Sequence, residues 1–210
     1  MLPFAALTIA ATAALLASER VGWRAGVWIA KPLASTGFVA AALAKGALDS
    51  PYGVWLLAGL VLAWWGDVLL IPREKPAAFL AGLVSFLLGH VAYAGAFAVR
   101  GLDLPTAGFA LLAVLPASLF ALREVLPHVP VRMRRPVLAY LVVISVMLVC
   151  AMGTVGHAGR PAIAIGALAF YASDLAVARE RFVAKSFTNK LWGLPLYFGA
   201  QLLLASTVAP

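Results

Sequence analysis

The sequence predicts an all-α membrane protein, in which residues 1–210 form a single integral membrane domain built as a bundle of about eight transmembrane helices. The amino-acid composition supports this prediction. Of the 210 residues, 64% are hydrophobic and 11% are charged, whereas a soluble domain has roughly 45–50% apolar and about 25% charged residues. The many aliphatic residues exclude a disordered chain, and the single cysteine, Cys150, excludes a disulfide scaffold.

The individual spans follow from apolar stretches separated by charged residues, prolines and glycines. A helix needs about 20 mostly apolar residues to cross a hydrocarbon core roughly 30 Å thick. We expect the first span to be an anchor and not a cleaved signal, because no Lys or Arg precedes it, whereas Arg20 and Arg24 follow it. The predicted spans are residues 2–17, 25–43, 53–71, 77–98, 104–121, 137–155, 161–178 and 190–208.

Positive charges lie mainly in the odd-numbered loops between these spans. Twelve Lys and Arg residues fall in odd loops and three in even loops. Because cytoplasmic loops carry the excess of Lys and Arg, we expect the odd loops to face the cytoplasm and both termini to face outward. The net charge of +8 then reflects topology, and no nucleic-acid partner is expected. The twelve are Arg20, Arg24, Arg73, Lys75, Arg123, Arg132, Arg134, Arg135, Arg179, Arg181, Lys185 and Lys190, and the three are Lys45, Arg100 and Arg160.

A faint internal repeat relates the third and fourth spans to the seventh and eighth. Residues 65–69 resemble residues 172–176, each followed by an Arg-Glu pair, and residues 93–96 resemble residues 197–200. A chain so rich in Ala, Gly and Leu can produce such matches by chance. A true repeat would be parallel, and it would bring the aspartates of the two segments to related positions around a pseudo-axis.

Three charged residues fall inside predicted spans: Lys31, Asp67 and Asp174. Each charge costs about 2.5–3.5 kcal/mol at a helix centre and less toward the ends. Buried together, the two aspartates and the lysine could satisfy one another, and ionisable groups inside a membrane are candidates for function. The alternatives are a structural ion pair and a lysine that snorkels to the nearby interface.

The depths of these residues place them in one layer. At about 1.5 Å per residue, both aspartates lie roughly 6 Å below the same surface, Lys31 roughly 9 Å and Tyr197 roughly 10 Å. A polar line continues inward through Ser85 and Gln201 to His90, at roughly 12, 16 and 20 Å. We therefore expect a site that begins near the cytoplasmic surface, although His90 and Tyr197 also fit ordinary buried hydrogen-bonding roles.

Other catalytic patterns are missing from the sequence. The segment around Ser85 does not match G-x-S-x-G. The three histidines, His90, His128 and His157, lie in different elements without metal-ligand spacing, so neither a metal nor another cofactor is expected. What remains is a carboxylate pair in a dry setting, where repulsion favours one protonated and one ionised group, an acid and a base. The sequence does not assign the two roles.

The same residues carry a family resemblance. The chain resembles bacterial members of the YhhN family, which is related to the TMEM86 lysoplasmalogenases, over nearly its whole length. The resemblance implies hydrolysis of the vinyl ether bond of lysoplasmalogens, releasing a fatty aldehyde and a glycerophospho head group, in the inner membrane of a bacterium. The motifs are Lys31-Pro32-Leu33, Gly66-Asp67-Val68-Leu69-Leu70, the spaced set Phe79, Gly82, Leu83, Phe86, His90 and Tyr93, then Ser173-Asp174, and finally Tyr197, Ala200 and Gln201.

An acid and a water-activating base suffice for this reaction, which parallels the action of an inverting glycosidase. The expected partners are a lysophospholipid substrate, such as lysoplasmenyl ethanolamine or choline, and membrane lipids. We expect Asp67 and Asp174 to be catalytic. We expect binding or supporting roles for Lys31, Ser85, His90, Tyr93, Ser173, Tyr197 and Gln201.

Two other functions fit a membrane carboxylate pair. A proton-coupled transporter or lipid carrier uses buried carboxylates and internal repeats as naturally as a hydrolase does. An intramembrane aspartyl protease also uses two aspartates, but it requires Tyr-Asp and Gly-x-Gly-Asp motifs. Here Trp64 replaces the first glycine before Asp67, and Ser173 replaces the tyrosine before Asp174.

Overall fold

The computed structural model describes residues 1–72, 74–158 and 161–208. Two arginines of the loop count, Arg73 and Arg160, and the side chain of His157 lie outside the described residues. Within these ranges the regular structure is entirely helical. The helices are α1 (Leu2–Val21), α2 (Arg24–Leu43), α3 (Pro51–Leu69), α4 (Pro76–Arg100), α5 (Leu104–Val125), the 3₁₀ turn η1 (Leu126–His128), α6 (Val131–Ala158), α7 (Pro161–Ala178), the π-helix η2 (Arg179–Val183) and α8 (Phe187–Ser206).

The predicted all-α bundle is confirmed, and each of the eight predicted spans coincides with one long helix. The largest difference in a boundary is at α6, which begins at Val131 and not near residue 137. Arg132, Arg134 and Arg135 indicated a loop because they are charged, but a helix can continue beyond the apolar layer into water. Pro136 lies inside this helix, where it lacks the N–H group that would bond to the Arg132 carbonyl oxygen.

The chain is a multi-pass membrane protein. Among the described residues, seven helices are long and apolar enough to cross a membrane, and α8 is not one of these seven. Although α8 has 20 residues, it contains Thr188, Asn189, Lys190 and Gln201, which lower its mean hydropathy. It packs against α7, α1, α2 and α3, so Asn189, Lys190 and Gln201 lie among other helices, whereas Thr188 is exposed. Because α8 is packed among other helices, its polar side chains can form part of the candidate site.

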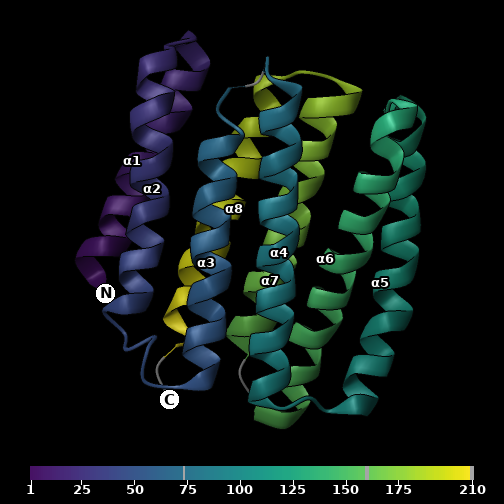
Figure 1. The fold of residues 1–210 in the computed structure, drawn as a ribbon. Helices are drawn as coiled ribbons and strands as arrows, with labels where there is room; N and C mark the ends of the chain where they lie inside the picture. The colour runs from purple at the N-terminus through teal and green to yellow at the C-terminus, as the bar shows by residue number, and fades with distance from the viewer. Residues whose placement is uncertain (73, 159–160, 209–210) are drawn as a thin grey trace.

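Neighbouring helices run in opposite directions, and consecutive helices pack as pairs (Figure 1). The pair α1–α2 forms one edge of the bundle and α5–α6 the other, with α3, α4, α7 and α8 between them (Figure 1). The start of α1 and the end of α8 lie toward the lower end of the view. The last residues of α1, α3, α5 and α7 therefore lie at the opposite end, which we call the charged end.

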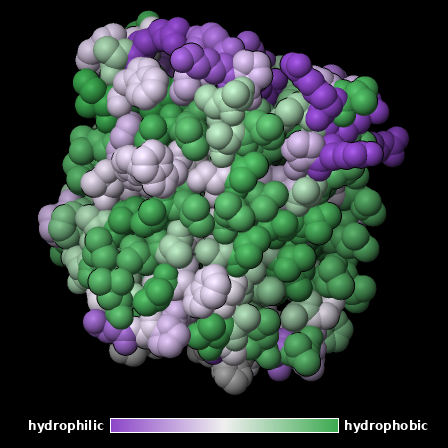
Figure 2. All heavy atoms as spheres, in the orientation of Figure 1, coloured by the Kyte–Doolittle hydropathy of each residue, from purple (hydrophilic) through white to green (hydrophobic). Residues whose placement is uncertain are grey.

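The surface polarity follows this arrangement. Figure 2 shows hydrophilic residues gathered at the charged end and mostly apolar residues across the middle of the face in view. On α5 the apolar side chains of Phe109, Leu112 and Phe120 are largely exposed, as expected for residues that face lipid. The asymmetry of charge in the sequence is thus an asymmetry between the two ends of one bundle.

Glycines on α3 permit its close contact with α4. A Cβ atom at Gly59 would lie 2.5 Å from the Tyr93 ring, and one at Gly66 would lie 2.5 Å from the Phe86 ring. Real Cβ atoms do not approach other atoms so closely, so both positions require glycine. The contact brings the buried aromatic face of α4 against α3, with Phe86 packed at Gly66, the residue before Asp67.

Candidate functional site

Asp67 lies in the last turn of α3 and is 2% exposed. Its Oδ2 accepts hydrogen bonds from the Ser35 hydroxyl of α2 and the Tyr197 hydroxyl of α8, both at 2.6 Å. Its Oδ1 lies 3.2 Å from Nζ of Lys31 on α2. Every one of these partners presents a donor, and such an arrangement favours the ionised carboxylate.

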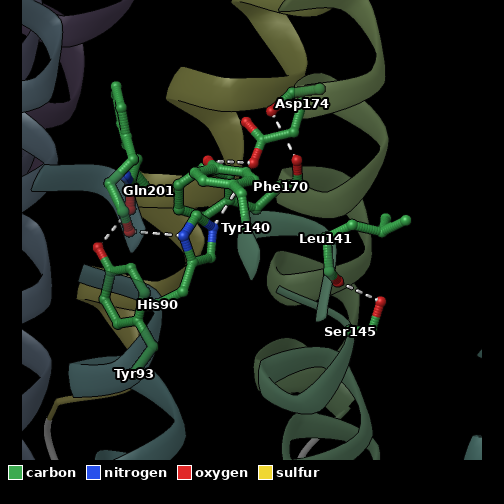
Figure 3. A network of polar contacts seen from close by, with 10 residues as sticks. His90, Tyr93, Tyr140, Leu141, Ser145, Phe170, Asp174 and Gln201 are labelled. Atoms are coloured by element: carbon green, nitrogen blue, oxygen red, sulfur yellow. Dashed lines mark hydrogen bonds and ion pairs between the residues drawn. The ribbon is translucent and has the colours of Figure 1, made fainter. Parts of the chain in front are cut away.

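Asp174, on α7, has a different environment. Its Oδ2 accepts a hydrogen bond from the Tyr140 hydroxyl of α6 at 2.6 Å and lies 3.6 Å from Nε2 of His90 on α4. Figure 3 shows the His90 ring and the Tyr140 hydroxyl both directed at this carboxyl group. The side chain is 16% exposed, compared with 3% for Asp67, so it is the more accessible of the two carboxyl groups.

The tautomer of His90 follows from its other nitrogen. Nδ1 lies 2.6 Å from the backbone carbonyl oxygen of Phe86, and a carbonyl oxygen can only accept a hydrogen bond. Nδ1 therefore carries a proton, and in the neutral ring Nε2 presents a lone pair toward Asp174. At 3.6 Å the two atoms lie beyond hydrogen-bond distance, and Nε2 has no hydrogen-bond partner among the described residues.

The two carboxyl groups line the same cavity, which has a volume of about 560 Å³. Lys31, Tyr140, Ser173 and Tyr197 also line it. On one side its wall is apolar and comes from α5 and α6, and at the charged end its wall carries both acidic and basic side chains. The apolar residues include Leu122, Val125, Leu141 and Ile144, and the charged residues are Glu19, Glu180, Arg181, Lys185 and Lys190.

Four of the expected site residues lie outside the cavity lining: Ser85, His90, Tyr93 and Gln201. Ser85 donates to the Leu62 carbonyl oxygen of α3 at 2.6 Å. Tyr93 donates to Oε1 of Gln201 at 2.7 Å, as Figure 3 shows. These residues are buried. Their contacts join α4 to α3 and α8 behind the two aspartates, so their positions support the site from outside the cavity.

The structure joins Lys31 and Tyr197 directly to Asp67, in agreement with the predicted layer. The expectation that Asp174 shares this layer, about 14 Å above His90, is wrong, because Asp174 lies beside His90. The cause is at the end of α7, where the helical path continues through η2 to Val183. Asp174 therefore lies nine residues before the end of this path and deeper than the sequence indicated.

Sequence reasoning missed Ser35 and Tyr140, the hydroxyl donors that contact Asp67 and Asp174. Ser35 follows Lys31 by four residues, and this spacing places both on one face of a helix, so a search for neighbours of Lys31 would have found it. No pattern distinguishes Tyr140 in the apolar sixth span. Only the packing of α6 against α4 and α7 brings it to the site.

Residues 26–208 match the YhhN family. The chain belongs to this family. It is 29% identical to lysoplasmalogenase TMEM86A of Bos taurus over 164 residues, which are 75% of this chain and 66% of that protein. It is 34% identical to lysoplasmalogenase TMEM86B of Mus musculus over 151 residues, 71% of this chain and 62% of that protein. It is 32% identical to the lysoplasmalogenase of Mycobacterium tuberculosis over 180 residues, 80% of this chain and 66% of that protein.

The chain thus spans slightly less than two thirds of the length of these relatives. No solved structure matches it significantly. The matched segment of this YhhN protein contains every residue of the candidate site, from Lys31 to Gln201. Among its described residues, no group of three or more His, Cys, Asp or Glu side chains is placed to hold a metal ion.

Proposed function

We propose that this YhhN protein hydrolyses the vinyl ether bond of a lysoplasmalogen, with Asp174 as the acid and Asp67 as the base. The observation that carries the proposal is the presence in one cavity of two carboxyl groups with contrasting partners. The relatives named lysoplasmalogenase support the choice of substrate. The cavity volume of about 560 Å³ lies within the range of small-molecule sites.

Asp67 is suited to the role of base. The ammonium group of Lys31 and the hydroxyl groups of Ser35 and Tyr197 stabilise its negative charge. All three hold the carboxylate in a fixed orientation at the cavity wall. A water molecule at this wall would be polarised toward the site of positive charge on the substrate.

Asp174 is suited to the role of acid. A protonated Asp174 can donate to the substrate, and the neighbouring His90 ring is held by Phe86. Tyr140 donates to the same carboxyl oxygen and fixes its direction. Asp174 lines the cavity, so its carboxyl group is accessible to a substrate bound there.

The reaction balances with these two groups alone. Asp174 gives its proton to the β-carbon of the vinyl ether, which leaves an oxocarbenium ion at the α-carbon. Water attacks the α-carbon and loses a proton to Asp67, forming a hemiacetal. The hemiacetal hydroxyl returns a proton to Asp174 while Asp67 protonates the departing glycerol oxygen. The products are a fatty aldehyde and a glycerophospho alcohol, and both carboxyl groups regain their starting states.

The direct test is product analysis by mass spectrometry with purified protein in detergent or nanodiscs. A lysoplasmenyl ethanolamine lipid should yield a free aldehyde, and in D₂O the aldehyde should carry one deuterium at carbon 2, the former β-carbon. An acyl lysophospholipid of the same length should remain intact. Release of a fatty acid from the ester would instead indicate an esterase, and passage of unchanged lipid across sealed vesicles would indicate a carrier.

Removing the Tyr140 hydroxyl should slow this reaction without unfolding the protein. In Tyr140→Phe the ring keeps its contact with His90, at 5.2 Å between centroids, but Asp174 loses its hydrogen bond. We expect kcat to fall about tenfold, because the lost hydrogen bond stabilises the negative charge that develops on Asp174 as it gives up its proton. The matched control is Tyr52→Phe, because the Tyr52 hydroxyl pairs with Thr207 far from the cavity. Equal rates for both variants would remove Tyr140 from the mechanism.

The proposal also includes orientation: the charged end, where the cavity has its charged wall, faces the cytoplasm of a bacterial inner membrane. Single cysteines in a Cys150→Ser background test it. In spheroplasts, an impermeant maleimide should label Asp49→Cys at once and label Arg132→Cys only after permeabilisation. The reverse pattern would place the charged end outside.

A further inference from the structure

A second group of charged side chains lies at the charged end of the cavity, separate from the two aspartates. Nζ of Lys190, in the first turns of α8, lies 3.1 Å from Oε2 of Glu19 on α1 and 3.5 Å from Oε1 of Glu180 in η2. The other carboxyl oxygen of Glu180 accepts from the Ser186 backbone amide at 2.8 Å and from Asn189 Nδ2 at 3.2 Å. We call Glu19, Glu180, Lys190 and the nearby cavity-lining Lys185 the mouth cluster.

Three members of the mouth cluster differ from the surface ion pairs of the same end, whereas Lys185 is exposed. The side chains of Glu19, Lys190 and Glu180 are 7%, 18% and 24% exposed, whereas those of the Arg24–Glu74 pair are 70% and 64% exposed. Charges removed from water to this extent cost several kcal/mol each before their attraction offsets the loss. Apolar residues could join α1 to α8 without this cost. The presence of both signs of charge on a cavity wall therefore points to a charged ligand.

The distance from the mouth cluster to the carboxyl groups matches a phospholipid head group. Lys190 precedes Tyr197 by seven residues and Glu180 follows Asp174 by six, which correspond to separations of roughly 10 Å along the helix axes. In a lysophospholipid, the extended path from the sn-1 oxygen to the nitrogen of an ethanolamine head group also spans roughly 10 Å. A lipid with its sn-1 oxygen at Asp174 would therefore place its head group at the mouth cluster.

We propose that the mouth cluster binds a zwitterionic head group, a phosphodiester joined to an ammonium group. Lys190 and Lys185 bind the phosphate, and Glu19 and Glu180 bind the ammonium group in exchange for their contacts with Lys190. The two ion pairs of Lys190 are replaced by contacts of all four side chains with the head group, so binding does not leave a buried charge uncompensated. The apolar wall of α5 and α6 then holds the chain. The inference takes one point from the proposed function, namely that a lysophospholipid binds in this cavity.

Equilibrium binding of two acyl lysolipids to purified protein tests the proposal. Neither lysophosphatidylethanolamine, which is zwitterionic, nor lysophosphatidylglycerol, which is anionic, has a vinyl ether. The wild type should prefer the first. Glu19→Gln and Glu180→Gln should weaken binding of the zwitterion by about tenfold, from the loss of a charge-assisted contact, and leave the anionic lipid unaffected. Lys185→Met should weaken both lipids by a similar factor.

Matched controls remove a charge of the same kind from the same end but outside the cavity. These are Glu124→Gln and Lys75→Met, neither of which should change either affinity. The Glu180 side chain accepts hydrogen bonds from Ser186 and Asn189, so Glu180→Gln could disturb this loop. Glu19→Gln tests the same carboxylate role from another helix. Glycerophosphoethanolamine should displace the zwitterionic lipid, whereas inorganic phosphate at the same concentration should not.

Three results would overturn the proposal. The first is unchanged head-group preference in both glutamate variants. The second is equal weakening of both lipids together with a lower melting temperature, which would identify a structural clamp. The third is displacement by inorganic phosphate as effective as by glycerophosphoethanolamine, which would identify a simple anion site. Because both lipids lack a vinyl ether, a negative aldehyde assay would refute only the hydrolase and leave this test valid.

Discussion

Asp67→Asn and Asp174→Asn are each expected to lower aldehyde release by about a thousandfold, because each removes one partner of a general acid–base pair. The double variant should be no slower than either single variant, since two groups that act in the same proton cycle are not additive. Both asparagines are nearly isosteric with aspartate and can accept the hydrogen bonds of Tyr197 and Tyr140. The measurement is the initial rate of aldehyde formation, with melting temperature as the test of folding.

Azide distinguishes the two roles. An anionic nucleophile needs no base, so azide should capture the oxocarbenium ion in Asp67→Asn and restore substrate consumption. It should have no effect in Asp174→Asn, where the β-carbon is not protonated. The control is Asp49→Asn at the opposite end of the bundle, which should retain the wild-type rate. Rescue of Asp174→Asn alone would reverse the assignment of acid and base, and full activity in both variants would refute the pair.

Lys31→Met is expected to destabilise the protein by about 3–5 kcal/mol, because it leaves a buried carboxylate without its cation. Nζ of Lys31 lies 3.2 Å from Oδ1 of Asp67, and the two side chains are 14% and 3% exposed. The expected result is a marked fall in the melting temperature of the detergent-solubilised protein. The exposed Lys75→Met at the same end should melt at the wild-type temperature.

The double variant Lys31→Met/Asp67→Asn separates stability from catalysis. Removal of both charges leaves neither one buried alone, so most of the lost stability should return, while aldehyde release remains as low as in Asp67→Asn. A single Lys31→Met variant as stable as the wild type would show that the lysine snorkels to the interface and that its pairing with Asp67 contributes little.

Depth was the most predictable feature of the candidate site. Position along an apolar span determines distance from the membrane surface, and so Lys31, Asp67 and Tyr197 could be placed in one layer before their contacts were known. His90 shows the limit of this reasoning. The depth of its neighbour Asp174 was measured from the predicted end of the seventh span at residue 178. The helical path in fact continues through η2, whose charged residues are typical of a loop.

Lateral position was not predictable. A span fixes how deep a side chain lies, but the rotation of each helix and the choice of its neighbours depend on the packing of all eight. Tyr140 reaches Asp174 because α6 packs against α4 and α7. The mouth cluster forms because α1 and α8, at opposite ends of the chain, lie side by side.

The sequence by itself determined the fold class, the number of long helices, the unequal charge of the two ends and the few polar groups that lie within the bilayer. These follow from transfer of each residue between water and hydrocarbon, which depends on local composition. Only the tertiary structure decided which donors surround Asp67, that Asp174 faces His90, and that both carboxyl groups share a cavity. Such contacts arise from side-chain packing between helices that are distant in sequence, and no local sequence pattern specifies this packing.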